Sequence, residues 1–254
     1  MGKAIYSDEY TKLILGDSFK ELKKVESNSI DFIFADPPYF LSGNGITCSS
    51  GKMTSVNKGK WDEEINLQEK LKFNDKWLKE CFRILKDNGT IAISGTFHNI
   101  YTIGVSLEKN KFDIINNITW QKNNPPPNIS CRALTHSTET VLWAKKKGTK
   151  HQFNYDLMKE INGGKQMKDV WTFPLTKPSE KKFGKHPTQK PLALLERLIL
   201  LSTNEDALVL DPFSGSGTTG VACKKLNRRY IGIEKEEEYM NLSIERIKGT
   251  SKGE

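Results

Sequence analysis

The sequence predicts an α/β protein with a doubly wound, Rossmann-like sheet of seven strands and helices on both faces. Seven short apolar runs rich in β-branched residues alternate with segments of helical periodicity, which is the usual order of such a sheet. A glycine-rich turn between a late strand and a helix points the same way. At 254 residues the chain can bury one full-sized core, so we expect one elaborated domain.

The strands are predicted, in chain order, at residues 11–15, 30–35, 90–94, 114–120, 140–144, 207–210 and 230–233. Helical periodicity predicts helices at residues 66–85, 191–201, 218–225 and 236–247. Gly89 lies just beyond the first helix and Pro191 at the start of the second, where each residue type is favoured. The alternation therefore indicates strands joined by helices in one sheet.

Positive charge is concentrated in one part of the chain. Lysine and arginine outnumber aspartate and glutamate by 39 to 31, which gives a formal net charge of +8. Residues 145–190 contain twelve lysines, no arginine and four acidic residues, so this segment accounts for the whole excess. A single lysine in such a run usually belongs to a solvated face, but the cluster as a whole favours nucleic acid as a partner. We expect phosphate contacts here.

The sequence also argues against several classes of protein. Its four cysteines form no C-x-x-C pair and its four histidines lack metal-ligand spacing, so neither a disulfide framework nor a metal site is expected. The amino terminus has no apolar signal region, and Glu196 and Arg197 interrupt the longest apolar stretch. We therefore expect a cytoplasmic protein that does not enter a membrane.

The first chemical motif is Asp211-Pro212-Phe213-Ser214-Gly215-Ser216-Gly217-Thr218-Thr219-Gly220, which links a predicted strand to a predicted helix. It contains G-x-G-x-x-G in the context of a nucleotide site, and Glu234 follows Gly215 by nineteen residues at the end of the next strand. Glycines let a ligand approach the backbone, and the acid can bind ribose hydroxyls. We place Gly215, Gly217, Thr218 and Glu234 in a cofactor site, whose spacing also admits an NAD-dependent oxidoreductase.

The second motif, Asp36-Pro37-Pro38-Tyr39, ends the strand at 30–35 and so lies at the carboxyl edge of the sheet, where open α/β folds bind ligands. A base amine is a poor nucleophile because its lone pair is delocalised into the ring. Asp36 and the carbonyl of Pro37 can accept its two hydrogens and aim the lone pair at an electrophile, while Tyr39 stacks on the base. Such residues are also routine turn formers, so the motif gains its functional weight from the glycine motif.

In the order of these motifs the chain resembles the β class of DNA amino-methyltransferases, a circularly permuted class in which D-P-P-Y precedes the base-recognition region and F-x-G-x-G comes near the carboxyl end. The resemblance covers residues 13–247. It implies the Rossmann-like fold of S-adenosylmethionine-dependent methyltransferases and transfer of the cofactor's methyl group to the exocyclic amine of a DNA base. D-P-P-Y goes mostly with adenine N6, so cytosine N4 is the near alternative. An NAD-dependent oxidoreductase is the distant alternative, and the glycine motif disfavours a DNA-binding module without a cofactor.

The resemblance implies further cofactor contacts. Asp17, at the end of the strand at 11–15, matches an acid that contacts the cofactor adenine, although a plain strand-end turn also explains it. Phe213 would pack against the cofactor, and Asp211 would face its ammonium end. Both residues also suit a purely structural role at the end of a strand.

A third segment, His186-Pro187-Thr188-Gln189-Lys190-Pro191, resembles the family segment beside the methionine end of the cofactor. Lys190 would pair with the methionine carboxylate, and Thr188 and Gln189 would form hydrogen bonds nearby. The same segment also suits ordinary helix capping, because Pro191 lies at a predicted helix start.

The predicted organisation is a catalytic domain formed by residues 1–144 and 186–248, with an inserted basic target-recognition region at 145–185, a flexible substrate loop at 40–60 and a frayed tail at 249–254. The amine of a paired base is out of reach, so the enzyme is expected to flip the base or to use single-stranded DNA. Members of the resembled class often accompany a restriction endonuclease and often dimerise, so both partners are expected by analogy.

Overall fold

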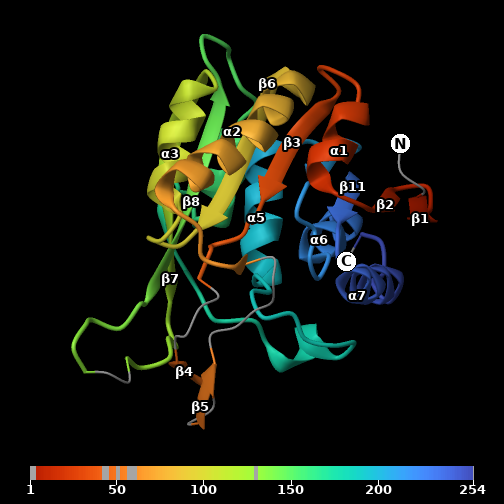
Figure 1. Cartoon of the computed structure of the whole chain (residues 1–254). Coiled ribbons are helices and arrows are strands. Elements are labelled where there is room, and N and C mark those ends of the chain that lie inside the picture. Colours follow the sequence, from red (N-terminus) through yellow and green to blue (C-terminus); the bar gives the residue numbers. More distant parts are fainter. Residues whose placement is uncertain (1–3, 42–45, 50–51, 56–61, 129–130, 254) are drawn as a thin grey trace.

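The computed structural model describes residues 4–41, 46–49, 52–55, 62–128 and 131–253. Within these residues one mixed sheet of nine strands runs in the order β1-β2-β11-β10-β3-β6-β8-β7-β9 (Figure 1). All seven predicted strands belong to it, and two short edge strands, β1 (Ala4–Ser7) and β9 (Val170–Phe173), extend it on either side. The predicted α/β fold is therefore confirmed, with a wider sheet.

The other strands of this sheet are β2 (Thr11–Leu15), β3 (Ile30–Ala35), β6 (Leu85–Gly95), β7 (Phe112–Lys122), β8 (Thr138–Lys146), β10 (Leu208–Asp211) and β11 (Arg229–Glu234). The central neighbours from β2 to β6 pair in parallel, whereas β8 runs antiparallel to both β6 and β7. Central strands of this kind are covered on both faces, which explains why they read as continuous apolar runs in the sequence.

The helices are α1 (Ser18–Glu21), α2 (Leu67–Ile84), α3 (Ile100–Lys109), α4 (Tyr155–Ile161), α5 (Leu192–Ser202), α6 (Thr218–Lys225) and α7 (Glu237–Lys248), with short 3₁₀ turns η1 (Leu22–Lys24) and η3 (Pro178–Lys181). The four predicted helices correspond to α2, α5, α6 and α7. A capping box between Asn66 and Glu69 starts α2.

Two hydrophobic clusters, one on each face of the sheet, hold the layers together. Trp77 and Leu78 of α2 and Ile103 of α3 pack on one face. Leu194 of α5 and Met240 of α7 pack on the other, together with residues of α4 and α6. Figure 1 shows the resulting arrangement of a sheet between two helical layers. The predicted placement of helices on both faces is thus confirmed.

Strand direction decides which side chains meet at the functional edge of the sheet. Because β8 is antiparallel to β6, its start lies beside the carboxyl end of β6, where Thr140 pairs with Gly95, and its end lies at the far edge, where Lys145 pairs with Thr90. Lys145 and Lys146 therefore lie at the edge opposite the strand ends that carry the predicted motifs. The phosphate contacts expected of the basic segment stay a prediction, and the antiparallel direction of β8 separates these two lysines from the functional edge.

The segments predicted to lie outside the catalytic core are described in part. Of the loop at 40–60, residues 42–45, 50–51 and 56–60 lie outside the described residues, and β4 (Ile46–Ser49) and β5 (Lys52–Ser55) form a separate antiparallel pair (Figure 1). The segment 145–185 contributes α4 and β9, and β9 pairs with β7 in the main sheet. After α7, the Lys252 ammonium donates a hydrogen bond to the Tyr10 hydroxyl. The roles given to these segments stay predictions.

In the part of the chain that the structure describes, no helix has both the length and the apolar character needed to cross a lipid bilayer.

Candidate cofactor and amine site

The glycine-rich turn folds back tightly between β10 and α6, and two of its glycines adopt conformations with positive φ. Gly215 has φ of 50° and lines a cavity at the carboxyl edge of the sheet. Gly217 has φ of 71° and caps α6, where a Cβ atom would lie 2.1 Å from Ser243 Oγ of α7. Any larger residue at Gly217 would clash, so this glycine is required for packing and does not itself line the cavity.

The cavity has a volume of about 200 Å³ and collects residues from all three predicted motifs. The predicted site residues that line it are Asp17, Asp36, Pro38, Thr188, Gln189, Lys190, Asp211, Phe213, Gly215, Thr218 and Glu234. Pro37, Tyr39 and Gly217 are not among its lining residues. The structure therefore brings most of the predicted site together from segments far apart in the sequence.

Glu234 presents a fixed carboxylate at the end of β11. Its Oε2 accepts a hydrogen bond from the Gly215 amide at 2.7 Å, and its Oε1 accepts from the amides of Lys235 at 2.8 Å and Glu236 at 2.9 Å. Burial raises the pKa of Glu234, and these backbone donors oppose that rise. Three backbone donors leave the side chain a single orientation, with lone pairs still available to a ligand hydroxyl.

Asp211 lies deeper, at the end of β10. Its Oδ1 accepts from the Phe213 amide at 3.0 Å and its Oδ2 accepts from the Thr219 hydroxyl at 2.6 Å. Burial raises the pKa of Asp211 to about 7, although both hydrogen bonds oppose the shift. A carboxylate in this state has a strong affinity for a cation placed beside it.

Aromatic rings form one wall of the cavity. The Phe213 ring stacks near Phe73 of α2, with ring centroids 6.2 Å apart, and Phe73 contacts the Phe19 ring edge-on at 5.1 Å. Asp17 lines the cavity two residues before Phe19. Its Oδ1 accepts a hydrogen bond from the Phe19 amide at 2.8 Å and so caps α1. The sequence missed Phe19 and Phe73, because an aromatic residue on a helix usually belongs to the core.

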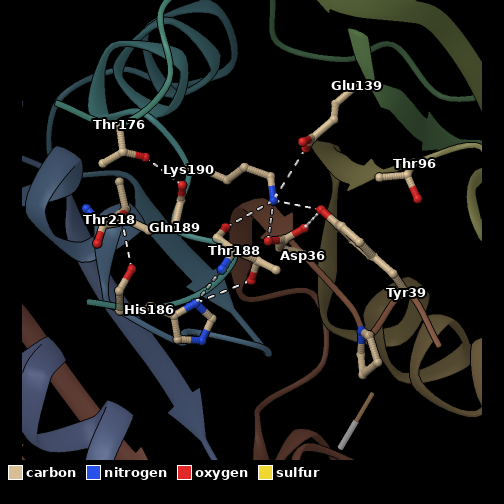
Figure 2. A network of polar contacts seen from close by, with 12 residues as sticks. Asp36, Tyr39, Thr96, Glu139, Thr176, His186, Thr188, Gln189, Lys190 and Thr218 are labelled. Atoms are coloured by element: carbon tan, nitrogen blue, oxygen red, sulfur yellow. Dashed lines mark hydrogen bonds and ion pairs between the residues drawn. The ribbon is translucent and has the colours of Figure 1, made fainter. Parts of the chain in front are cut away.

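Asp36 follows β3 and is held by two side chains at once (Figure 2). The Tyr39 hydroxyl donates to Asp36 Oδ1 at 2.7 Å, and the Lys190 ammonium donates to Asp36 Oδ2 at 2.5 Å and to the Tyr39 oxygen at 2.7 Å. Burial raises the pKa of Asp36, while the Lys190 ammonium opposes that rise. Burial alone would lower the pKa of Lys190, but Asp36 and Glu139 raise it above its usual value.

Lys190 has partners within the protein as well as a place in the cavity lining. Its ammonium is bound by Asp36 and Tyr39, and its pairing with the methionine carboxylate of the cofactor stays a prediction. The physical reason for the contacts within the protein is the crowding of buried acids at this edge, since an ammonium that leaves water must find an opposite charge. Thr188 and Gln189 line the cavity as expected.

Two further acids at the site were not predicted. The Asp62 carboxylate is fully buried and accepts hydrogen bonds from the amides of Tyr39 and Phe40, both at 2.7 Å, and of Leu41 at 3.3 Å. Glu139 of β8 pairs through Oε1 with the Lys122 ammonium at 2.8 Å and through Oε2 with Lys190 at 3.7 Å. A lone acid beside a loop or at a strand end gives no local signal, so only the fold identifies them.

The chain matches known proteins over nearly its whole length. A family model described as DNA methylase matches residues 30–245. The Type II methyltransferase M2.LlaDCHI of Lactococcus lactis subsp. cremoris is 56% identical over 256 residues, which span 100% of this chain and 95% of that protein. The Type II methyltransferase M2.DpnII of Streptococcus pneumoniae is 57% identical over 249 residues, 97% of this chain and 93% of that protein.

The chain is also similar to solved structures of DNA methyltransferases. The complex of M1.HpyAVI with S-adenosylmethionine is 31% identical, with a TM-score of 0.71 over 93% of this chain and 98% of that one. PvuII DNA methyltransferase, which is cytosine-N4-specific, is 20% identical with a TM-score of 0.78 over 96% of this chain and 89% of that one. At that identity the second comparison shows the fold alone.

A Rossmann-like sheet with a cavity at its carboxyl edge defines an α/β protein that binds a nucleotide-like cofactor. The chain belongs to the DNA methylase family. The predicted methyltransferase fold, the enzyme class and S-adenosylmethionine as cofactor are thereby confirmed. The NAD-dependent oxidoreductase and the DNA-binding module without a cofactor are set aside.

Proposed function

We propose that this DNA methylase transfers a methyl group from S-adenosylmethionine to the N6 amine of adenine within a specific DNA sequence. The observation that carries the proposal is the Asp36 carboxylate, which is buried, lines the cofactor cavity and follows directly from the strand end. An acid at this position, as opposed to serine, goes mostly with adenine in the class that the chain resembles. Cytosine N4 is the second candidate, because the cytosine-N4-specific PvuII enzyme shares the fold.

The cavity fits S-adenosylmethionine by the chemistry of its donors and acceptors. The fixed Glu234 carboxylate suits the two ribose hydroxyls, and the Phe213 and Phe73 rings suit flat or apolar parts of the cofactor. Asp211, whose pKa is raised to about 7, suits the ammonium group at the methionine end. When bound, the cofactor supplies a methyl group already activated by its sulfonium sulfur.

The residues at 36–39 have the task of orienting the amine and excluding water. Asp36 and the Pro37 carbonyl accept the two amine hydrogens, which turns the nitrogen lone pair toward the methyl donor. Pro37 and Pro38 stiffen the turn, and Asn99 donates a hydrogen bond to the Pro38 carbonyl at 3.3 Å. Tyr39 is buried and its hydroxyl is bound to Asp36, and its proposed role is to stack on the face of the base beside the cofactor cavity.

The order of the motifs supports assignment to the circularly permuted β class, since residues 36–39 precede the glycine motif at 211–220. The target base must leave its stack or come from a single strand, because the Asp36 site is buried. The relatives' designation as Type II methyltransferases supports a companion restriction endonuclease. Dimerisation, a cytoplasmic location and base recognition by residues 145–185 complete the proposal.

The test is transfer of radiolabelled methyl from S-adenosylmethionine to duplex and single-stranded DNA, followed by nucleoside analysis of the product. We expect label in N6-methyladenine, and the two DNA forms report the preferred strandedness. Label in N4-methylcytosine would replace adenine by the second candidate. Absence of label in both DNA forms, with cofactor binding intact, would overturn the proposed substrate.

A further inference from the structure

We infer that Glu139 is a positioning residue for the proposed reaction: it holds the Lys190 ammonium on Asp36 and so keeps that carboxylate aimed into the site. The inference rests on the proposed function, in which Asp36 accepts hydrogens from the amine. It concerns a residue of β8 that no sequence motif marks.

The geometry places four charged side chains in a row, which we call the charged network: Lys122, Glu139, Lys190 and Asp36. Lys122 pairs with Glu139 Oε1 at 2.8 Å, and Lys190 lies 3.7 Å from Glu139 Oε2 and 2.5 Å from Asp36 Oδ2. Figure 2 shows Lys190 between Glu139 and Asp36, with its ammonium directed at both. The four side chains are 5% to 13% exposed, so water does little to screen them.

The signs alternate along the charged network, which makes it formally neutral. A carboxylate buried alone would take up a proton, and a protonated Asp36 would accept hydrogens from an amine poorly. The Lys190 ammonium prevents this, but a lysine side chain has many rotamers and can turn toward another anion. Glu139 supplies the second anchor that restricts the ammonium, and Lys122 compensates the charge of Glu139.

The charged groups that face Asp36 come from several elements. Tyr39 lies in its own turn, Lys190 in the segment before α5, Glu139 on β8 and Asp211 on β10. Removing the Glu139 charge takes away a repulsion and makes Asp36 easier to ionise. Removing the Lys190 charge takes away an attraction and makes Asp36 harder to ionise. The two substitutions therefore displace the titration of Asp36 in opposite directions.

The experiment measures the pH dependence of single-turnover methylation for the wild type, Glu139→Gln and Lys190→Met. In Glu139→Gln we expect the acid limb of the profile, where the rate falls as Asp36 takes up a proton, to lie at lower pH. We expect the plateau rate, measured above this limb, to be reduced about tenfold to a hundredfold, because the Lys190 ammonium is no longer held in place. In Lys190→Met we expect the acid limb at higher pH. The KM for S-adenosylmethionine should change little in Glu139→Gln, since Glu139 does not line the cofactor cavity.

A second readout does not depend on turnover. The carbonyl band of protonated Asp36, identified in infrared spectra by its loss in Asp36→Asn, should titrate with the same opposite displacements in the two variants. A wild type that methylates neither DNA form would refute the proposed function, whereas this titration would still decide the role of Glu139.

The matched control is Asp113→Asn, which removes a lysine-bound carboxylate from the same pair of strands at the opposite edge, where Asp113 is 41% exposed. It should leave the pH profile and the plateau rate unchanged. An acid limb and a plateau rate in Glu139→Gln that match this control would overturn the inference. If Glu139→Gln melts at a much lower temperature, Glu139→Asp keeps the charge and should recover the wild-type acid limb, and its failure to do so would count against the inference.

Discussion

The two ends of the β7–β8 pair carry the same kinds of charged groups, and the lysines at both ends are largely buried, but the carboxylates differ in their exposure to solvent. At the functional edge, Glu139 lies between the ammonium groups of Lys122 and Lys190, and every member is at least 87% buried. At the far edge, Lys145 and Lys146 pair with carboxylates of Asp113 and Asp87 that are 41% and 76% exposed.

The difference teaches that burial, more than pairing, decides what an ion pair contributes. An exposed pair is worth about 0 to 1 kcal/mol, because water and salt screen it and two long side chains lose freedom. A buried pair costs several kcal/mol in desolvation and leaves an uncompensated charge when one partner is removed. The far-edge pairs therefore contribute little to stability, whereas the charged network is costly to bury, which agrees with the positioning role inferred for Glu139.

The largest effect at the functional edge is expected for Asp36→Asn. The amide keeps the size of the side chain but loses the charge and presents donors toward the amine, so we expect turnover to fall about a hundredfold to a thousandfold. Affinity for S-adenosylmethionine should stay within about a few fold, because Glu234 and Asp211 are untouched. Single-turnover rates and calorimetric binding measure the two quantities, and loss of cofactor binding would refute the assigned role.

Asp62→Ala tests a buried carboxylate that is bound by backbone amides. The change leaves the amides of Tyr39, Phe40 and Leu41 without their acceptor, so the free energy of unfolding should fall by about 1–3 kcal/mol. Turnover should fall as well, because these donors fix the turn after Asp36. Asp62→Asn retains an acceptor oxygen and should lose less in denaturant unfolding. Equal losses in the two variants would contradict this explanation.

We expect the Asp211 carboxyl to make cofactor binding dependent on pH. Its pKa is raised to about 7, so it binds a proton in the folded protein well above the pH at which it does so in the unfolded chain. This group therefore adds most stability at low pH, and that contribution is lost as the pH rises through about 7. A cofactor ammonium favours the ionised form, so affinity should weaken below that pH.

Calorimetric titrations of S-adenosylmethionine at several pH values measure this dependence. Asp211→Asn should bind the cofactor more weakly and with a flatter pH profile. A profile as steep as that of the wild type would show that another group titrates.

The smallest effect is expected at the far edge. In Lys146→Met the free energy of unfolding should change by about 1 kcal/mol or less, since the partner Asp87 carboxylate remains solvated. Thermal melts at low and high salt should differ little between the variant and the wild type. A drop in turnover would show that the far edge contributes to function.

The sequence was sufficient for the elements with strong local patterns. Buried parallel strands such as 30–35 read as apolar runs, and the glycine motif marks its own turn, so the sheet and the cofactor cavity were predictable. The edge strand β9 and helix α4 were not, because they lie in a polar segment and are held by packing against the core. The contact between Lys190 and Asp36 was not predictable either, because the two residues lie 154 positions apart in the chain.

Strand β9 limits how this protein can acquire a new sequence preference. Trp171 and Phe173 of β9 are 2% and 8% exposed, and the Phe173 carbonyl accepts a hydrogen bond from the Trp120 indole at 3.0 Å. The segment at 145–185, for which we propose a role in reading DNA, is therefore also part of the core and cannot be exchanged as an independent unit. Evolution or engineering can vary the exposed turn at 162–166 freely, whereas wholesale replacement of the segment would unpair the edge of the sheet.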